Sequence, residues 1–219
     1  MTKRIVDIVF SVILIFFTVP VMGLIFVLIK LDSYGPSIFK QRRVGFDRRQ
    51  QGNGNGTKPP ARDRRLRNLG GKPFTMYKFR SMVQEAEEML PAVVNLGALT
   101  EPVYKLQDDP RVTRFGKLLR RTSMDELPQL FNILRGDMSL VGPRPEAQRI
   151  VFLYHQDHRK RLRVKPGLTG LQQIRCRGSK SMRKRMRYDL YYIENRSSLI
   201  DLWILLKTVI VVIRGKGAF

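Results

Sequence analysis

The feature that most constrains this chain is an apolar run near its N-terminus. Residues 5–31 are almost all apolar, a length that exceeds the ~20 residues a helix needs to cross a bilayer. The interruptions are Asp7, Ser11, Thr18, Pro20, Gly23 and Lys30. The run is too long for the apolar region of a cleaved signal peptide, and no small-residue cleavage site follows it. We therefore expect residues 1–32 to form a membrane helix.

The flanks of this run argue against a simple crossing. Basic residues lie on both sides of it: Lys3, Arg4, Lys30, Lys40, Arg42 and Arg43. Positive charge favours the cytoplasmic side of a membrane, so both ends favour the same side. Pro20, near the middle, removes a helical hydrogen bond and favours a bend. Two alternatives stay open on these grounds: a kinked spanning helix, and a re-entrant helix that bends at Pro20 and returns to the same face.

The charge of the chain limits its partners. It carries 41 Lys and Arg against 18 Asp and Glu, a formal net charge of +23, which suits nucleic acid or an anionic membrane surface. The apolar run favours the membrane, and we expect no nucleic acid partner. A single cysteine, Cys176, excludes an internal disulfide, and the two histidines argue against a Ser-His-Asp site or a His-rich zinc site.

The candidate chemistry is centred on two adjacent carboxylates, Asp125 and Glu126. The apolar residues that follow them recur at helical spacing up to Gly136, so the pair is expected at a helix N-terminus. One interpretation is structural, because Ser123 and Glu126 have the spacing of a capping box. The other is chemical: a helix dipole favours the ionised carboxylate, and an ionised Asp125 could attack phosphorus or hold a metal.

Arg144 strengthens the chemical interpretation. Pro143 and Pro145 flank it, remove two backbone donors and fix two φ angles, so its guanidinium is presented from a stiffened loop. A guanidinium binds phosphate with two parallel hydrogen bonds. Together with Arg120, this grouping suits an anionic substrate that carries phosphate.

The remaining segments predict an α+β chain that is mostly helical. Residues 38–45 predict a short edge strand or an interfacial segment. A strand is expected at residues 73–82, where alternation would place Lys78 and Arg80 on one face. Helices are expected at 83–99, 115–119 and 147–162. Residues 46–72 are too poor in apolar side chains to fold alone and are expected to be a mobile basic loop.

Two C-terminal segments are expected to meet the membrane. A basic cluster suits an anionic leaflet, and it consists of Lys180, Arg183, Lys184, Arg185 and Arg187. Residues 199–214 are apolar, with Trp203 and Lys207 embedded, and predict an amphipathic interfacial helix or a core helix. We expect the whole of residues 33–219 to form one cytosolic domain at the membrane surface.

Two segments carry a resemblance to a known family. They read Arg-Arg-Thr-Ser-Met-Asp-Glu-Leu-Pro-Gln-Leu-Phe-Asn at 120–132 and Gly-Asp-Met-Ser-Leu-Val-Gly-Pro-Arg-Pro-Glu at 136–146. With the membrane run, the segment at 38–45 and Lys-Pro-Gly-Leu-Thr-Gly-Leu at 165–171, the chain resembles the bacterial sugar transferases, small monotopic polyprenyl-phosphate phosphoglycosyl transferases. Residues 171–177 depart from the family pattern, because they lack the tryptophan and small residues expected before Arg177.

The resemblance implies an activity. It implies transfer of a phosphosugar from a nucleoside diphosphate sugar, most simply a UDP-sugar, to polyprenyl phosphate with release of UMP, through a covalent intermediate on Asp125. Asp125 and Glu126 would hold Mg²⁺. The implied substrate contacts are Lys78, Arg80, Arg120, Pro143, Arg144 and Arg177.

The resemblance also implies a location and a setting. The first helix would be re-entrant, and the protein would lie among membrane lipids at the cytoplasmic face of the bacterial inner membrane, initiating assembly of a glycan such as an exopolysaccharide. Whether it forms a homo-oligomer stays open. The alternative is a non-catalytic, membrane-tethered binder of nucleic acid or anionic lipid.

Overall fold

The computed structural model describes residues 2–47, 71–93, 106, 108–154, 156–178 and 181–214. Its helices are α1 (Thr2–Asp32), α2 (Leu90–Val93), α3 (Arg114–Thr122), α4 (Gln129–Arg135), α5 (Gln148–Phe152), α6 (Gln156–Arg159), α7 (Leu171–Arg175), α8 (Met182–Asn195) and α9 (Ser198–Arg214). The strands are β1 (Ile38–Val44), β2 (Pro73–Phe79), β3 (Ser139–Val141) and β4 (Gly167–Thr169). The expected fold class, α+β and mostly helical, is confirmed. Nearly all of the expected basic loop at 46–72, and the second half of the expected helix at 83–99, lie outside the described residues.

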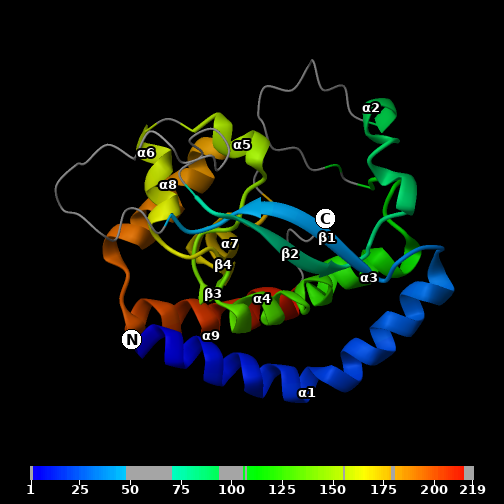
Figure 1. Ribbon diagram of the computed structural model, residues 1–219, viewed down its shortest axis with the longest axis horizontal. Coiled ribbons are helices and arrows are strands. Elements are labelled where there is room, and N and C mark those ends of the chain that lie inside the picture. The colour runs from blue at the N-terminus through cyan, green and yellow to red at the C-terminus, as the bar shows by residue number, and fades with distance from the viewer. Residues whose placement is uncertain are drawn as a thin grey trace.

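Helix α1 is one continuous helix of 31 residues with Pro20 inside it, long and apolar enough to cross a membrane. Figure 1 shows it curving along one side of the molecule, below α4 and α9. Most of its apolar side chains are exposed, whereas Asp7, Ser11, Ile25 and Ile29 are buried against the rest of the protein. The helix therefore presents an apolar surface outward and a mixed surface inward.

The first turns of α1 are fastened to the body of the protein. Lys3 Nζ donates to the Val141 carbonyl over 3.1 Å and forms an ion pair with Asp201 at 2.5 Å. Arg4 donates to the carbonyls of Ile133 and Leu134, which lie in the last turn of α4. Carbonyls in a last turn lack the usual helical N–H donor, and the guanidinium bonds two of them; the Ile133 carbonyl also accepts from the Gly136 N–H.

A buried carboxylate makes the next contact. Asp7 Oδ1 accepts hydrogen bonds from Ser139 Oγ and from the Leu140 N–H, both over 2.9 Å, and Asp7 is only 4% exposed. An acidic residue inside an apolar helix is costly unless its charge is bonded. Here it joins α1 to β3, the strand that leads to Arg144.

The far end of α1 is held by Arg80. Its Nη2 donates to the Ser33 carbonyl over 2.6 Å and to the Ile29 carbonyl over 3.3 Å. Ser37 Oγ also donates to the Phe26 carbonyl over 3.0 Å. Both ends of α1 therefore contact the same body.

Strands β1 and β2 form an antiparallel pair in which Ile38 lies opposite Phe79 and Val44 opposite Pro73. The outer edge of β2 is completed by the Asn132 side chain of α4, which accepts from the Tyr77 N–H over 3.0 Å and donates to the Thr75 carbonyl over 2.7 Å. One amide thus satisfies a donor and an acceptor that the strand would otherwise leave unpaired. This contact fixes α4, and the turn before it, against the sheet.

Strands β3 and β4 are parallel, and the backbone at Gly142, just after β3, lies very close to the backbone at Gly167, where β4 begins. A Cβ added to Gly167 would lie 2.1 Å from the Gly142 nitrogen, and one added to Gly142 would lie 2.5 Å from the Lys165 carbonyl oxygen. Only glycine permits this backbone approach. The approach positions the loop 143–145 that follows β3.

Helix α9 is partly a core helix. Ile204 is fully buried in the main core with Leu130, Ile133 and Leu140, whereas Leu199, Leu202, Leu206, Val209, Ile210 and Ile213 are exposed. The expectation for 199–214 allowed an interfacial or a core helix. The buried Ile204 shows the core contact, and the exposed residues give the helix an apolar outer surface as well.

The expected helix at 147–162 is broken into α5, α6 and a 3₁₀ turn, so that prediction was wrong. The break follows Phe152 and lets Tyr154 turn inward, where its hydroxyl accepts a hydrogen bond from Arg161. A buried tyrosine hydroxyl usually finds such a hydrogen-bond partner.

We predict that Asp7→Ala lowers the free energy of unfolding by about 2 kcal/mol or more, because Ser139 and Leu140 would keep buried donors without an acceptor. Thermal and denaturant unfolding in detergent micelles measures this. The matched control is Ser11→Ala, one turn further along α1: the Ser11 hydroxyl is fully buried and has no hydrogen-bond partner in the described part of the chain. Equal effects of the two substitutions would contradict the role assigned to Asp7.

Candidate functional site

Asp125 and Glu126 lie in a 3₁₀ turn, Met124–Glu126, between α3 and α4. Helix α4 begins only after Pro128, and Ser123 has a left-handed backbone with φ 58°. The Ser123 side chain makes no capping hydrogen bond to this turn; its hydroxyl instead accepts from Arg177 Nη2 over 2.7 Å. The expected capping box was therefore wrong, and so was the position of the pair at the start of an α-helix. The turn presents both carboxylates to β2.

Glu126 is bonded to two cations from different parts of the chain. Its Oε1 accepts from Lys78 Nζ of β2 over 3.1 Å and from Arg144 Nη2 of the loop after β3 over 2.7 Å. Burial alone would raise the pKa of Glu126, but Arg144 and Lys78 together hold this pKa well below its ordinary value. Glu126 is therefore ionised and fully engaged, and it ties the strand to the loop.

Asp125 lies beside this bridge with weaker compensation for its charge. Its Oδ2 is 3.8 Å from Lys78 Nζ, and the residue is 9% exposed. Burial raises the pKa of the Asp125 carboxyl above its ordinary value, while the charges of Lys78, Arg144 and Arg120 oppose that shift. The expectation that a helix dipole keeps Asp125 ionised was wrong, because no α-helix starts there. Neighbouring cations, and not a helix start, oppose the effect of burial on this carboxyl.

Arg120 and Arg177 approach the carboxyl pair from α3 and from the segment after α7. Arg120 Nε donates to Ser81 Oγ over 2.9 Å, and Arg177 is held by Ser123 Oγ and by the Val211 carbonyl of α9 at 3.3 Å. The charge of Asp125 acts on the pKa of both guanidinium groups, which burial lowers. The structure thus brings Lys78, Arg120, Arg144 and Arg177 together around Asp125 and Glu126.

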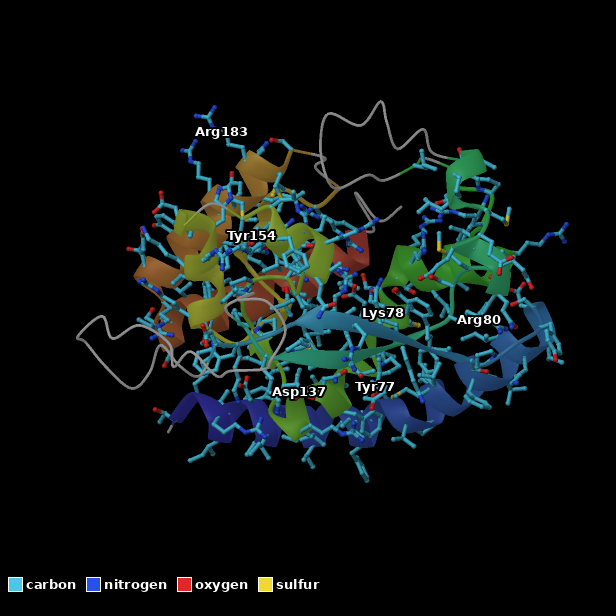
Figure 2. The ribbon with its side chains drawn as sticks, turned by 45° about the horizontal axis from the view of Figure 1, so that its top comes forward. Tyr77, Lys78, Arg80, Asp137, Tyr154 and Arg183 are labelled. Carbon is cyan, nitrogen blue, oxygen red and sulfur yellow. The ribbon has the colours of Figure 1, made fainter. Side chains whose placement is uncertain are left out.

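Arg80 is not brought to this group. It follows the end of β2, and its guanidinium is directed to the last turn of α1 (Figure 2). The strand alternation that suggested Lys78 and Arg80 on one face fails because β2 ends at Phe79. In this structure Arg80 holds α1 in place.

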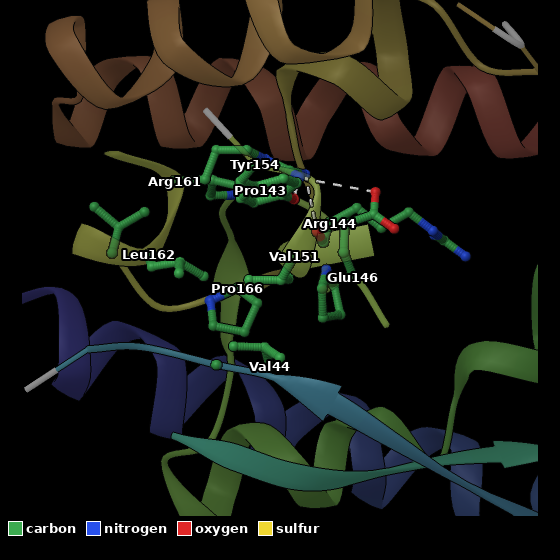
Figure 3. Close-up of a pocket in the computed structure, with 12 residues that line it drawn as sticks. Val44, Pro143, Arg144, Glu146, Val151, Tyr154, Arg161, Leu162 and Pro166 are labelled. Carbon is green, nitrogen blue, oxygen red and sulfur yellow. Dashed lines mark hydrogen bonds and ion pairs between the residues drawn. The ribbon is translucent and has the colours of Figure 1, made fainter. Parts of the chain in front are cut away.

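The loop 143–145 is fixed from two sides. The Pro143 carbonyl accepts from the Gly167 N–H over 2.9 Å, and the Arg144 carbonyl accepts from Arg161 Nη2 over 3.0 Å. Figure 3 shows a small pocket beside the loop, lined by Val44, Val151, Leu162 and Pro166 among others, with the Arg144 side chain extending out of it. The backbone of Arg144 is therefore held while its guanidinium reaches Glu126.

A buried network of charges lies behind this loop. Arg161 pairs with Asp189 at 2.6 Å and with Glu146 at 3.8 Å, and Arg185 pairs with Glu146 at 2.8 Å. Burial raises the pKa of Asp189 to about 6, although Arg161 opposes the shift. Sequence reasoning missed this network, because its members are spread from residue 146 to residue 189 and form no local motif.

The network corrects the expected basic cluster of 180–187. Arg185 is buried and paired with Glu146, so it is not part of a solvent-facing charge cluster. Figure 2 shows Arg183 on the side of the molecule opposite α1. This part of α8 therefore lies away from α1, and Lys180 lies outside the described residues.

Asp125 and Glu126 could hold a magnesium ion only together with oxygen ligands from a substrate or from water. No group of three or more Asp, Glu, His or Cys side chains suitable for a metal is found in the described ranges. Glu126 Oε1 is already bonded twice. Mg²⁺ is commonly held by one or two carboxylates together with phosphate oxygens of a substrate and water, and the pair fits that arrangement.

Comparison with known proteins identifies the family. The bacterial sugar transferase family model matches residues 1–52 and 59–215, and the chain belongs to this family. It is 37% identical, over 99% of its length, to an undecaprenyl-phosphate galactose phosphotransferase of Salmonella typhimurium, of which it covers 41%. It is 35% identical to an exopolysaccharide production protein of Sinorhizobium fredii, with 100% of this chain and 88% of that protein covered. It is 36% identical to a UDP-N-acetylgalactosamine-undecaprenyl-phosphate N-acetylgalactosaminephosphotransferase of Aeromonas hydrophila, with 99% of this chain and 44% of that protein covered. The chain therefore spans about two fifths of some relatives and most of others.

We predict that Arg161→Met lowers the free energy of unfolding by about 3–5 kcal/mol, because Asp189 and Glu146 would keep buried charge without this partner. Denaturant unfolding measures the loss. The matched control, Lys160→Met, breaks an exposed ion pair with Asp157 and should cost less than about 1 kcal/mol. A small loss for Arg161→Met would mean that the network does not stabilise the loop.

Proposed function

We propose that this protein transfers a phosphosugar from a nucleoside diphosphate sugar, most simply a UDP-sugar, to polyprenyl phosphate and releases UMP. The product would start assembly of a glycan such as an exopolysaccharide. The observation that carries the proposal is the buried pair Asp125 and Glu126 beneath four cationic side chains. Family membership, and the undecaprenyl-phosphate phosphotransferases among the relatives, support it.

The proposed reaction has two displacement steps at one phosphorus atom. An Asp125 oxygen attacks the sugar-linked phosphorus, the bond to the UMP oxygen breaks, and UMP leaves with that electron pair. An oxygen of the polyprenyl phosphate then attacks the same phosphorus and releases the Asp125 carboxylate. Asp125 suits this task because its carboxylate, unlike that of Glu126, makes no hydrogen bond to Lys78 or Arg144 in the described part of the structure.

Glu126 has a different role in this scheme. It accepts from Lys78 and Arg144 and is held ionised, so it is a poor proton acceptor and acts by fixing two cations beside Asp125. Both substrates are anionic, and positioned cations reduce their repulsion as charge moves to the leaving oxygen. Mg²⁺, held by Asp125 and Glu126, would add Lewis-acid neutralisation of the phosphate oxygens.

We further propose that α1 is re-entrant and that the protein lies at the cytoplasmic face of the bacterial inner membrane. Lys3 and Asp7 at one end of α1 and Arg80 at the other bind the same body, which supports an entry and exit on one side. The exposed apolar residues of α1 and α9 provide the contact with membrane lipids. A membrane-surface site would receive a soluble donor and a lipid acceptor together.

The alternative is a membrane-tethered binder of nucleic acid or anionic lipid that performs no catalysis. It accounts for the net charge and the exposed apolar helices. It gives no reason for two buried carboxylates surrounded by cations from β2, α3 and two loops. An anionic ligand is bound by cations, and nearby carboxylates would only repel it.

We predict that the purified protein releases UMP when incubated with Mg²⁺, undecaprenyl phosphate and a panel of UDP-sugars that includes UDP-galactose and UDP-N-acetylgalactosamine. Asp125→Asn should lower the rate by about three orders of magnitude or more, because it removes the nucleophile. The control is Asp157→Asn, an exposed carboxylate on α6. Release of no UMP from any sugar would favour the binding alternative.

For the topology, we predict that cysteines introduced at Thr2 and Ser33 react with a membrane-impermeant thiol reagent from the same side of the membrane. The native Cys176 is buried and is replaced by serine as background. Labelling from opposite sides would exclude the re-entrant helix and leave a spanning one.

A further inference from the structure

We infer that Arg43, held in place by Gln41, is a further substrate contact that binds the phosphate of the departing nucleotide. The inference rests on the proposed function and adds a residue to the same site. Neither the motif around Asp125 nor the loop around Arg144 contains Arg43. It lies on β1, about eighty positions earlier in the chain.

The register of the sheet places Arg43 on the correct face. In an antiparallel pair, residues directly opposite each other project from the same face. Arg43 lies opposite Phe74, Gln41 opposite Met76 and Phe39 opposite Lys78. Because side chains alternate along a strand, Arg43 and Gln41 share the face of Lys78, which reaches Glu126. Arg42 projects from the other face.

The side chain of Arg43 is held in one orientation, but it forms no direct ion pair within the described residues. Its Nε and Nη2 donate to Gln41 Oε1 over 3.1 and 2.6 Å, and within the described residues it forms no ion pair with a carboxylate. By contrast, Arg161 and Arg185 are each paired with an acid. A neutral amide orients the guanidinium without a direct ion pair, so its remaining donors stay available to a phosphate.

The surroundings of Arg43 connect it to the site. Arg144 and Glu126 are among the charges that act on its guanidinium, together with Glu146 and Arg149. Burial lowers the pKa of Arg43 to about 10, so it stays protonated at neutral pH. It therefore extends the group of cations around Asp125 in the direction of β1 and α5.

Its position along β1 separates it from the lipid side of the site. Strand β1 begins at Ile38, which packs with Ile25 and Ile29 of α1, and ends at Val44, which packs with Ile150 and Leu162. Figure 1 shows this end of β1 near α5 and farther from α1. Arg177, in contrast, is bonded to α9. A soluble nucleotide would approach the Val44 end of β1, and a lipid phosphate would approach the side where Arg177 meets α9.

The chemistry of the first displacement fits a cation at that place. When the bond between the two phosphorus groups breaks, the leaving oxygen of UMP gains negative charge. A guanidinium with fixed orientation and no direct ion pair to a carboxylate stabilises that charge as it develops. Arg43 would therefore act on donor binding and on UMP release, and not on the lipid acceptor.

The test compares Arg43→Gln with Arg42→Gln, its neighbour on the opposite face of β1. Direct binding of UMP to the purified protein, by calorimetry in the presence of Mg²⁺, needs no turnover. We expect the Kd for UMP and the KM for the UDP-sugar to rise about tenfold or more in Arg43→Gln, while the KM for undecaprenyl phosphate stays within twofold of wild type. Arg42→Gln should leave all three values within about twofold.

A second variant guards against a folding defect. Gln41→Met keeps Arg43 but removes its hydrogen-bond acceptor, and we expect a rise of about threefold in the Kd for UMP with an unchanged unfolding midpoint. If Arg43→Gln binds UMP as wild type does, or if it raises the KM for the lipid instead, the inference is overturned. If the wild-type protein transfers no phosphosugar, the proposed function itself fails. The binding of UMP still tests the Arg43 contact separately, because it needs no turnover.

Discussion

The interaction on which the rest of this structure depends is the bridge from Lys78 through Glu126 to Arg144. Three separate segments meet there: a strand, a 3₁₀ turn and a proline-bracketed loop. The carboxylate is buried, so it requires its two partners, and each partner is in turn held at one position by it. Asp125 is placed by the same turn but is not hydrogen-bonded to Lys78 or Arg144 in the described structure. The two adjacent acids therefore differ: Glu126 holds two cations in place, and the Asp125 carboxylate is available to react.

The apolar helix is mechanically joined to this site. Asp7 bonds to the backbone of β3, and Lys3 bonds to the Val141 carbonyl at its end. Arg144 follows Val141 by three residues. At the other end of α1, Arg80 leaves β2 two residues after Lys78 and binds the final turn of the helix. The position of α1 and the geometry of the cations beside Asp125 are therefore linked through a few short, buried contacts.

Much of this arrangement could be predicted from local patterns. The apolar run and the alternation at 73–82 depend on neighbouring residues, and they gave α1 and, as far as Phe79, β2. The motif around Asp125 gave the carboxyl pair but not the 3₁₀ turn that holds it. The failures have a common cause, because they involve partners distant in sequence. Arg80 was assigned to substrate since its partner, the end of α1, is 47 positions away. Arg185 was assigned to the membrane since Glu146 is 39 positions away.

The most direct test of the central claim is the intact mass of the protein after mixing with its donor alone. With the correct UDP-sugar and Mg²⁺ but no lipid, the mass should increase by one phosphosugar, with one UMP released per protein chain, and the increase should disappear when undecaprenyl phosphate is added. Asp125→Asn should show no increase. Release of UMP only when the lipid is present, without any change in protein mass, would contradict the covalent intermediate and point to direct transfer between the two substrates.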